Sequence, residues 1–423
     1  MDIIQHRVAN GVLKAMPLQF TPETLRDRLA VDVEIVVDPA RAGLDLWPAL
    51  WATAAAVARQ FSGRVYLRSG LAAAMPAPRP LSARCQWIDR PSNAPVVIGI
   101  GVDPCPPHNV SCFGDARAGI IHYDELGKAA APPCAIECFI LAGYLSFAAL
   151  ALAVGLPPYR ADFAQRLLRV DYDATLLNGM AVNGNGFTLI GAGQLGQAYL
   201  ALLYFLREGD FAGMPFAVVD FDRFEEANAS TQVLLGDEPD WVGERKAEYV
   251  ASLLTRWGAS AVAEIRRLEG GWKRPEVFPR RALSGVDNFE ARRLLMGAGF
   301  DRVYDAGLGG NLAAPSLTWH VLPGDPALGR MLFPDNPVPA LEVPPAPWAA
   351  AIVDSPGRCG WLRFSGVTAS APSLGLAAAG FLLAEISSAI SSARRGRALL
   401  WSSLIPIDRQ PIAYGKCQTV LVD

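Results

Sequence analysis

The 423-residue sequence predicts an α/β fold with mostly parallel sheets, built from two consecutive units. Short apolar runs typical of buried strands alternate with helical patterns, as expected when helices connect parallel strands. A glycine-rich turn joins one such strand to a helix within residues 187–206. The first 157 residues also repeat the order of strand, aspartate, helix and strand seen in the second half. The length fits two or three domains.

Composition narrows the functional classes before any motif is considered. The chain has 38 Lys and Arg against 41 Asp and Glu, so charge gives no reason to expect binding to nucleic acid or anionic membrane. Hydrophobic residues make up 51% and charged residues 19%, which favours a folded chain over a disordered one. Seven cysteines without a C-x-x-C pair disfavour a disulfide framework. We expect a cytoplasmic protein without a secretion signal.

Two long uncharged stretches, residues 138–158 and 365–384, are long enough to be compared with membrane spans. Both are rich in Ala, Gly and Ser and lack a basic flank at the start. Wholly buried helices of an α/β fold have the same composition. We therefore expect two core helices and no membrane partner.

A glycine loop is the first motif that indicates chemistry. Gly191, Gly193 and Gly196 have G-x-G-x-x-G spacing between a strand-like run and a helical pattern. Such glycines let the backbone approach a phosphate, and the N–H groups at the helix N-terminus stabilise its charge. A second strand ends at Asp220, 24 residues after the last glycine, where a carboxylate can accept hydrogen bonds from ribose hydroxyls. These features predict a nucleotide site but fit NAD, FAD and ATP alike.

Further motifs follow in a fixed order. They are D-x-D at Asp220 and Asp222, polar residues at Asn228 and Gln232, V-G-x-x-K ending at Lys246, and D-N at Asp287 and Asn288. A dehydrogenase has no need of this set. In order and spacing it resembles the adenylating family of ubiquitin-activating enzymes and of the bacterial enzymes that activate ubiquitin-like sulfur carriers. The resemblance covers roughly residues 180–390.

The resemblance implies ATP and Mg²⁺ as cofactors, with a role for each motif residue. Asp220 would hold the ribose, and Asp287 would hold Mg²⁺. Asn228, Gln232 and Lys246 would contact the triphosphate. Physical chemistry agrees, because a carboxylate that attacks the α-phosphate meets like charge, which a lysine and a metal ion neutralise.

One position departs from the family pattern. The family usually has Arg immediately before the Gln, but this chain has Thr231. Either Arg223 or Arg245 substitutes for it, or an arginine reaches in from another domain or protomer; otherwise adenylation is impaired and the chain is a nucleotide-binding scaffold. Arginines just upstream of the glycine loop are candidates for the second case: Arg160, Arg166 and Arg169.

The two halves align as an internal duplication. Asp38 and Asp220 are 182 residues apart, and Asp103 and Asp287 are 184 apart. The first copy has no glycine loop in residues 1–31, before Asp38, and so should not bind ATP. We expect an inactive Rossmann-like domain at residues 1–175 and an active adenylation domain at residues 176–423. Ubiquitin-activating enzymes likewise pair an inactive with an active adenylation domain.

Cys359 is the candidate nucleophile. It lies in a Gly- and Pro-rich segment, within a crossover loop that we expect at about residues 323–366. In members of the resembled family that go beyond adenylation, a cysteine on this segment takes the acyl group as a thioester. Arg358 and Arg363 are close enough in sequence to lower the pKa of its thiol. The alternative is an ordinary loop cysteine.

The sequence thus predicts ATP-dependent adenylation of the C-terminal carboxylate of a small ubiquitin-like protein. Thioester transfer to Cys359 and hand-off to a conjugating enzyme would follow. Such a chain resembles the activating components of bacterial conjugation operons, some of which are linked to antiviral defence. Members of the resembled family are commonly dimeric, which implies that this chain can form a homodimer. Two other enzyme classes stay open: adenylation without a thioester, in sulfur-carrier, peptide or tRNA-base chemistry, and NAD- or FAD-dependent oxidoreduction.

Overall fold

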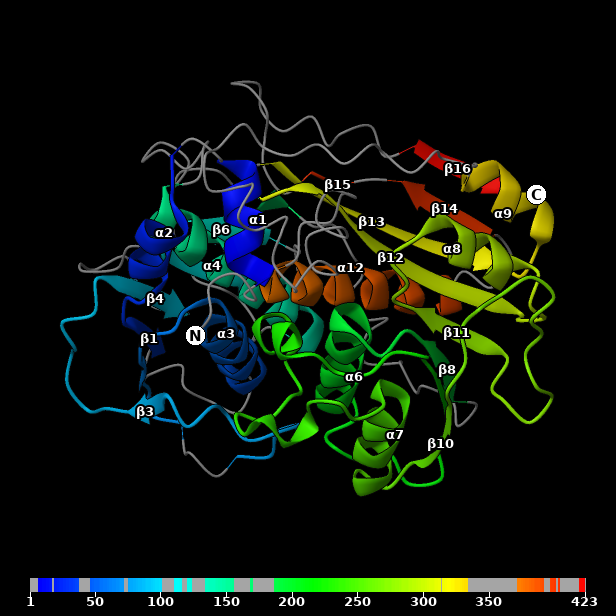
Figure 1. Ribbon diagram of the computed structural model, residues 1–423, viewed down its shortest axis with the longest axis horizontal. Coiled ribbons are helices and arrows are strands. Elements are labelled where there is room, and N and C mark those ends of the chain that lie inside the picture. Colours follow the sequence, from blue (N-terminus) through cyan, green and yellow to red (C-terminus); the bar gives the residue numbers. More distant parts are fainter. Residues whose placement is uncertain are drawn as a thin grey trace.

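The computed structural model describes most of the chain (Figure 1). The described residues are 7–16, 19–37, 46–71, 75–100, 110–115, 120–123, 134–155, 168–169, 186–312, 314–333, 371–391, 396–400, 402–403 and 418–422. Among the sequence predictions that fall outside these ranges are Cys359, Asp103 and the aspartate at position 38. The predicted boundary between residues 175 and 176 does too, so the domain division stays a prediction.

The first sheet has seven strands in the order β3-β2-β1-β4-β5-β6-β7. Strands β1 to β5 run parallel, and β6 and β7 continue the sheet in antiparallel pairings. Their bounds are β1 Val33–Val37, β2 Val65–Arg68, β3 Cys85–Trp87, β4 Val96–Ile100, β5 Val110–Asp115, β6 Ile120–Tyr123 and β7 Leu168–Arg169. The central strands β1 and β4 are continuous apolar runs apart from Glu34 and Gly99, as expected for parallel strands covered on both faces.

The second sheet has nine strands, with the main path β10-β9-β8-β11-β12-β13-β14-β16 and β15 paired to β13. Strands β8 to β12 are parallel, and the later strands are antiparallel. Their bounds are β8 Phe187–Ile190, β9 Pro215–Val219, β10 Ser260–Glu264, β11 Arg281–Ser284, β12 Arg302–Asn311, β13 Ala314–Pro323, β14 Gly396–Leu400, β15 Ser402–Ser403 and β16 Gln418–Val422. The strand order reverses between β8 and β11, which makes their carboxyl ends a topological switch point.

The α/β fold class is confirmed, and the two sheets repeat one strand order. However, the predicted alignment of Asp38 with Asp220 is wrong. Strand β1, which precedes position 38, lies between β2 and β4, just as β8 lies between β9 and β11. It therefore corresponds to the strand before the glycine loop, while β4 does correspond to β11 as predicted. An apolar strand followed by Asp is common in such folds, and only strand pairing distinguishes one from the next.

This correction moves the place where a phosphate loop would lie in the first half. The equivalent of the glycine loop is the segment between β1 and the next helix, residues 38–45, rather than residues 1–31. Its sequence, DPARAGLD, contains a single glycine. The first half therefore still lacks the G-x-G-x-x-G pattern.

Helices from both halves pack together in the middle of the molecule. Helices α3, α4, α6 and α12 contact one another, and α12 crosses the centre of the view beside α4 (Figure 1). One continuous apolar core includes residues of all four helices and of both sheets. The helix bounds are α1 Arg7–Ala15, α2 Pro22–Leu29, α3 Trp47–Gln60, α4 Ala135–Val154, α6 Gln194–Leu206, α7 Lys246–Arg256, α8 Phe289–Met296, α9 Pro326–Leu332 and α12 Pro372–Ser391, with 3₁₀ turns η3 Glu226–Ser230 and η4 Pro239–Trp241.

Helix α4 is the one helix of the described residues that is long and apolar enough to cross a membrane. In this structure 89% of its most apolar window is buried inside the protein. It packs against α3, α12 and α6. The two uncharged stretches of the sequence thus contribute core helices, as predicted.

Candidate functional site

The loops that follow β8, β9 and β11 meet at the switch point. The Gly191 N–H donates to the Val219 carbonyl at 2.9 Å, and the Gly285 N–H donates to the Ile190 carbonyl at 2.9 Å. These bonds join the glycine loop to the neighbouring strand ends on both sides. A crevice at this place is where open α/β sheets bind their ligands.

The glycine loop leads directly into α6, whose N-cap is Gly193. A Cβ atom at Gly193 would meet no heavy atom of the described residues within 4 Å. At Gly196 a Cβ atom would lie 2.1 Å from the Gly191 carbonyl oxygen, so a side chain is excluded there. Gly196 therefore permits close packing, whereas Gly193 leaves open the approach to the helix N-terminus, where an anion is stabilised.

Asp220 ties the glycine loop to the D-x-D motif. Its Oδ2 accepts from the Ala192 N–H at 2.7 Å, and its Oδ1 accepts from the Asp222 N–H at 2.8 Å. Burial raises the pKa of Asp220, although Lys246 and the two backbone donors oppose the shift. Each carboxylate oxygen can accept a second hydrogen bond, so the predicted contact with ribose hydroxyls remains chemically open.

Lys246 is buried, with its ammonium directed to the D-x-D motif. It is the first residue of α7, its backbone N–H donates to the Asp222 carbonyl, and its Nζ lies 3.1 Å from Asp222 Oδ2. The Asp222 side chain is 27% exposed, so the ion pair lies at the edge of the solvent. An ammonium has three donors, which leaves Lys246 able to bind a phosphate oxygen as well.

Asn228 and Gln232 are both buried. Gln232 Oε1 accepts from Gln197 Nε2 at 2.6 Å, and the same Nε2 lies 3.4 Å from the Ala192 carbonyl. Asn228 Oδ1 accepts from the Glu225 N–H, but Asn228 Nδ2 has no hydrogen-bond partner among the described residues. A buried donor without a partner is costly, so this amide is suited to receive an acceptor from a ligand.

Asp287 is exposed two residues after Gly285. Its Oδ1 accepts from Asn288 Nδ2 at 3.1 Å, and Asn288 caps α8 through the Ala291 N–H. Among the described residues no group of three or more His, Cys, Asp or Glu could hold a metal by itself. A single carboxylate still fits Mg²⁺, which takes most of its ligands from water and substrate phosphates.

Thr231 is buried at 1% exposure, and its Oγ1 has no partner in the described part of the chain. The two nearby arginines that were candidates to replace the family arginine both bind backbone. Arg223 donates to the Gly243 carbonyl at 2.6 Å, and Arg245 donates to the Phe221 carbonyl at 2.9 Å. Of the upstream candidates, Arg160 and Arg166 lie outside the described residues, and Arg169 ends the short strand β7.

The first half supplies arginines that the sequence did not indicate. The Arg7 N–H donates to Ser230 Oγ at 3.0 Å, and its guanidinium lies 3.8 Å from the Glu225 carboxylate. Arg59 of α3 donates to the carbonyls of Ala229, at 3.4 Å, and of Leu235. Both arginines therefore hold the segment that carries Asn228 and Gln232.

Further contacts join the first half to residues 225–237 of the second half. We call this set of contacts the 225–237 clamp. Asp237 Oδ2 accepts from Ser82 Oγ at 2.8 Å and from the Ala83 N–H at 2.6 Å, and Arg79 donates to the Tyr249 hydroxyl. These partners are more than 150 residues apart in the sequence, so no local sequence pattern predicts the contacts. The first half thus holds the segment of the second half that carries Asn228 and Gln232.

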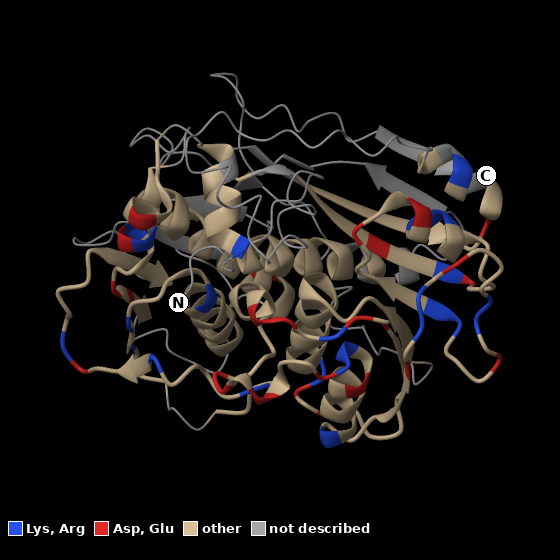
Figure 2. Ribbon diagram, viewed as in Figure 1, with Lys and Arg blue, Asp and Glu red and all other residues tan. Residues whose placement is uncertain are grey.

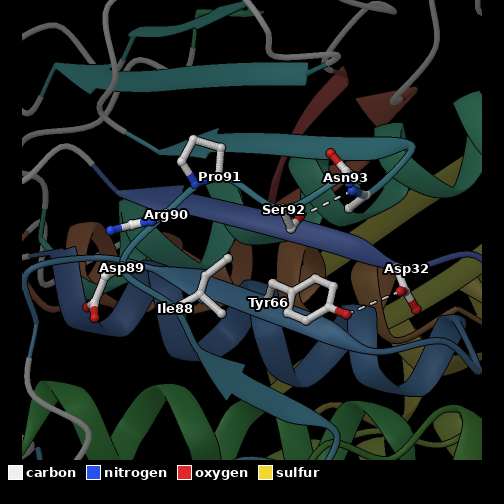
Figure 3. Close-up of a pocket in the computed structure, with 9 residues that line it drawn as sticks. Asp32, Tyr66, Ile88, Asp89, Arg90, Pro91, Ser92 and Asn93 are labelled. Carbon is white, nitrogen blue, oxygen red and sulfur yellow. Dashed lines mark hydrogen bonds between the residues drawn. The ribbon is translucent and has the colours of Figure 1, made fainter.

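A cavity of about 550 Å³ in the first half is separate from this site (Figure 3). Asp32 and Tyr66 line it together with the loop 88–94, and the Tyr66 hydroxyl donates to Asp32 at 3.4 Å. Asp32 precedes β1 and the loop precedes β4, so the cavity lies at the amino ends of these strands. The motif residues lie at the carboxyl ends of the second sheet. In the view of Figure 2, Lys and Arg are interspersed with Asp and Glu over both halves.

Comparison with known proteins finds relatives of the second half. Residues 185–393 match the family model described as the BilD C-terminal domain. A curated relative, the bacterial E1-like protein BilD of Collimonas sp. (strain OK412), is 32% identical over 200 residues, which is 47% of this chain and 43% of the relative. The match thus spans less than half of that relative's length. It confirms the predicted resemblance to the E1-like adenylating family for this part of the chain.

Two solved structures share more distant similarity. The crystal structure of E. coli MccB with MccA-N7isoASN is 13% identical, covers 72% of this chain and 96% of that chain, and has a TM-score of 0.34. The structure of E. coli tRNA N6-threonylcarbamoyladenosine dehydratase, TcdA, in complex with ATP is 14% identical, covers 52% and 92%, and has a TM-score of 0.27. Similarity at this level is too distant to place a ligand in this chain.

Proposed function

We propose that this protein uses ATP to adenylate the C-terminal carboxylate of a small ubiquitin-like protein, because residues 185–393 match the BilD C-terminal domain and the chain is similar to an E1-like protein. One observation carries the proposal. A continuous set of hydrogen bonds at the switch point links Gln232, Gln197, Ala192, Asp220, Asp222 and Lys246. The glycine loop, the D-x-D motif, Gln232 and Lys246 are thus joined by hydrogen bonds.

In the proposed reaction, a carboxylate oxygen of the partner forms a bond to the α-phosphorus, and the bond from that phosphorus to the pyrophosphate oxygen breaks. The open N–H groups around Gly193 hold phosphate oxygens, and Asp220 orients the ribose. Lys246 and the orphaned Asn228 amide donate to the phosphates as negative charge builds on them. Asp287 is the residue that would hold Mg²⁺, which supplies charge neutralisation when bound.

The relative's E1-like character also supports an extended proposal. After adenylation, the Cys359 thiolate attacks the acyl carbon, a thioester forms and AMP leaves. The acyl group then passes to a conjugating enzyme. The structure describes one competing thiol near the 225–237 clamp, that of Cys85, and burial raises its pKa to about 12. Cys85 is therefore a poor rival nucleophile.

The first experiment tests the nucleotide. Titration of the full chain with ATP and Mg²⁺ is expected to give saturable binding, and Lys246→Ala should weaken it at least tenfold, because a charged hydrogen bond of about 1.5–3 kcal/mol is lost. Lys273→Ala is the matched control, since Lys273 is exposed and its Nζ donates to the Gly297 carbonyl. Tight binding of NAD or FAD without ATP would overturn the proposal and favour an oxidoreductase.

The second experiment tests the reaction with a ubiquitin-like protein from a neighbouring reading frame that ends in Gly. Pyrophosphate release that requires this partner supports adenylation. ATP binding without pyrophosphate release would indicate a scaffold instead. A thioester that survives non-reducing electrophoresis and disappears in Cys359→Ala supports the extended proposal. If pyrophosphate is released and no thioester forms, the enzyme belongs to the class that adenylates without one.

A further inference from the structure

We propose that Arg292 is a positioning residue for Asp287, acting through a buried network at the carboxyl ends of β11 and β12. The inference rests on the proposed function, in which Asp287 is the residue that would hold the metal ion. Neither the motif pattern nor the comparisons assign a role to Arg292 or to the residues that bind it.

The guanidinium of Arg292 joins the Asp287 loop to β12. Its Nη2 donates to the Val286 carbonyl at 3.1 Å and to the Ala306 carbonyl at 3.1 Å. Val286 immediately precedes Asp287, so one end of this bridge fixes the backbone that carries the carboxylate. Arg292 is itself held on α8, which begins at the Asn288 cap, and it is only 7% exposed.

Asp305 completes the network from β12, the strand that pairs with β11. Its carboxylate is wholly buried and lies 3.1 Å from Arg292 Nε. It also accepts from Ser284 Oγ at 2.8 Å and pairs with His320 Nδ1 at 3.1 Å. Ser284 ends β11 and lies three residues before Asp287. The network therefore fixes both the strand end that enters the Asp287 loop and the loop backbone itself.

The surroundings leave the guanidinium little freedom. Its Cζ lies 5.8 Å from the ring centroids of Phe289 and of Phe333. A Cβ atom at Gly307 would lie 2.6 Å from Arg292 Nη2, so a side chain there would displace the guanidinium. The planar fork of Arg spans several acceptors in one fixed geometry, whereas the ammonium of Lys is a single point charge.

Stability alone does not require this arrangement. Taking a buried ion pair out of water costs free energy that its attraction often fails to recover, and apolar replacements are frequently as stable. What an apolar residue cannot do is donate to the Val286 carbonyl. Without that donor the 285–287 loop is free to relax, and a metal ion would meet a less pre-organised carboxylate.

The test uses Mn²⁺ as the probe and binding rather than turnover as the readout. The Mn²⁺ dissociation constant of the full-length protein is measured by electron paramagnetic resonance with no more than one equivalent of ATP, so that free ATP does not chelate the metal. ATP affinity is measured separately in EDTA. Arg292→Lys is expected to raise the Mn²⁺ constant about tenfold while changing ATP affinity in EDTA less than twofold. Arg293→Lys is the matched control, because Arg293 lies on the same helix and donates to the Phe333 carbonyl instead.

Two more variants keep the inference falsifiable. Asp287→Asn should raise the Mn²⁺ dissociation constant more than Arg292→Lys does and retain ATP binding in EDTA. Ser284→Ala removes one hydrogen-bond donor to Asp305 and leaves Arg292 and His320 in place. It should raise the Mn²⁺ dissociation constant about threefold. This variant tests the inference even if Arg292→Lys fails to fold. An unchanged Mn²⁺ constant in the folded variants, or an equal loss of ATP affinity in EDTA, overturns the inference alone. A wild-type protein that takes up neither ATP nor Mn²⁺ overturns the proposed function with it.

Discussion

Gly193→Ala should separate nucleotide binding from folding at the glycine loop. The added methyl group would meet no heavy atom of the described residues within 4 Å, and the φ angle of Gly193 is −83°. We therefore expect no loss of unfolding free energy. A gain of about 0.4–1 kcal/mol is expected instead, because Ala restricts the unfolded chain more than Gly does.

Nucleotide affinity should change in the opposite direction. The methyl group would stand where a phosphate must approach the N-terminus of α6, and losing one hydrogen bond to a charged oxygen costs about 1.5–3 kcal/mol. This corresponds to a roughly 10- to 150-fold weaker dissociation constant for ATP. Calorimetric titration with ATP and Mg²⁺, paired with urea unfolding of the same samples, measures both quantities.

Gly196→Ala is the contrasting variant. Its Cβ atom would lie 2.1 Å from the Gly191 carbonyl oxygen, so the loop must shift, and overpacking of this kind typically costs about 1–3 kcal/mol of stability. Both variants should bind ATP weakly, but only Gly196→Ala should also unfold at lower urea. If Gly193→Ala binds ATP as wild type does, the loop is not a phosphate cradle and the reasoning is refuted.

Three further predictions concern other parts of the chain. Arg59→Ala should lower the unfolding free energy by about 1.5–3 kcal/mol in urea titrations, because the 225–237 clamp loses a charged donor; a change as small as that of the exposed control Arg90→Ala would contradict this. Burial alone would raise the pKa of Asp305, but Arg292, His320 and Ser284 together hold it below the usual range. Its ionised form therefore stabilises the fold above pH about 4, and that contribution is lost as the pH falls through the folded-state pKa. Asp305→Asn should cost about 3 kcal/mol or more at pH 7 and progressively less on acidification, as urea unfolding at several pH values would reveal; a pH-independent difference would count against it. Since burial raises the pKa of Cys85 to about 12, its alkylation by iodoacetamide at pH 8 should be more than about 100-fold slower than that of an ordinary thiol, as peptide mass spectrometry can measure; rapid labelling would show that the thiol is accessible.

The local parts of the site were predictable from the sequence. A strand, a glycine turn and a helix are consecutive in the chain, so the loop at Gly191 and the start of α7 at Lys246 follow from local pattern. The core helices were predictable for the same reason, since a run of apolar residues specifies burial directly. The resemblance to the E1-like family rested on the order of these local motifs.

Non-local pairing was not predictable. The strand before position 38 was matched to the wrong partner, because its place in the sheet depends on β4, whose residues lie some 60 positions later. The contacts of Arg7 and Arg59 with the Asn228 segment follow from the packing of α1 and α3 on η3. His320 belongs to none of the sequence motifs, and it comes to lie beside Asp305 only because β12 and β13 pair. In each case the decisive neighbour is distant in sequence.

The close approach of α4 and α12 has a consequence for how the molecule can be divided. A Cβ atom at Gly143 would lie 2.6 Å from the Ser373 carbonyl oxygen, and one at Gly380 would lie 2.4 Å from Ile140 Cγ1. The two backbones thus touch along a seam between the halves that admits no larger side chain. Cutting the chain between the sheets would expose the apolar surface of this seam on both fragments. Neither fragment should therefore remain monomeric on its own. The first half then supplies part of a shared interior, and the whole chain should melt in a single transition.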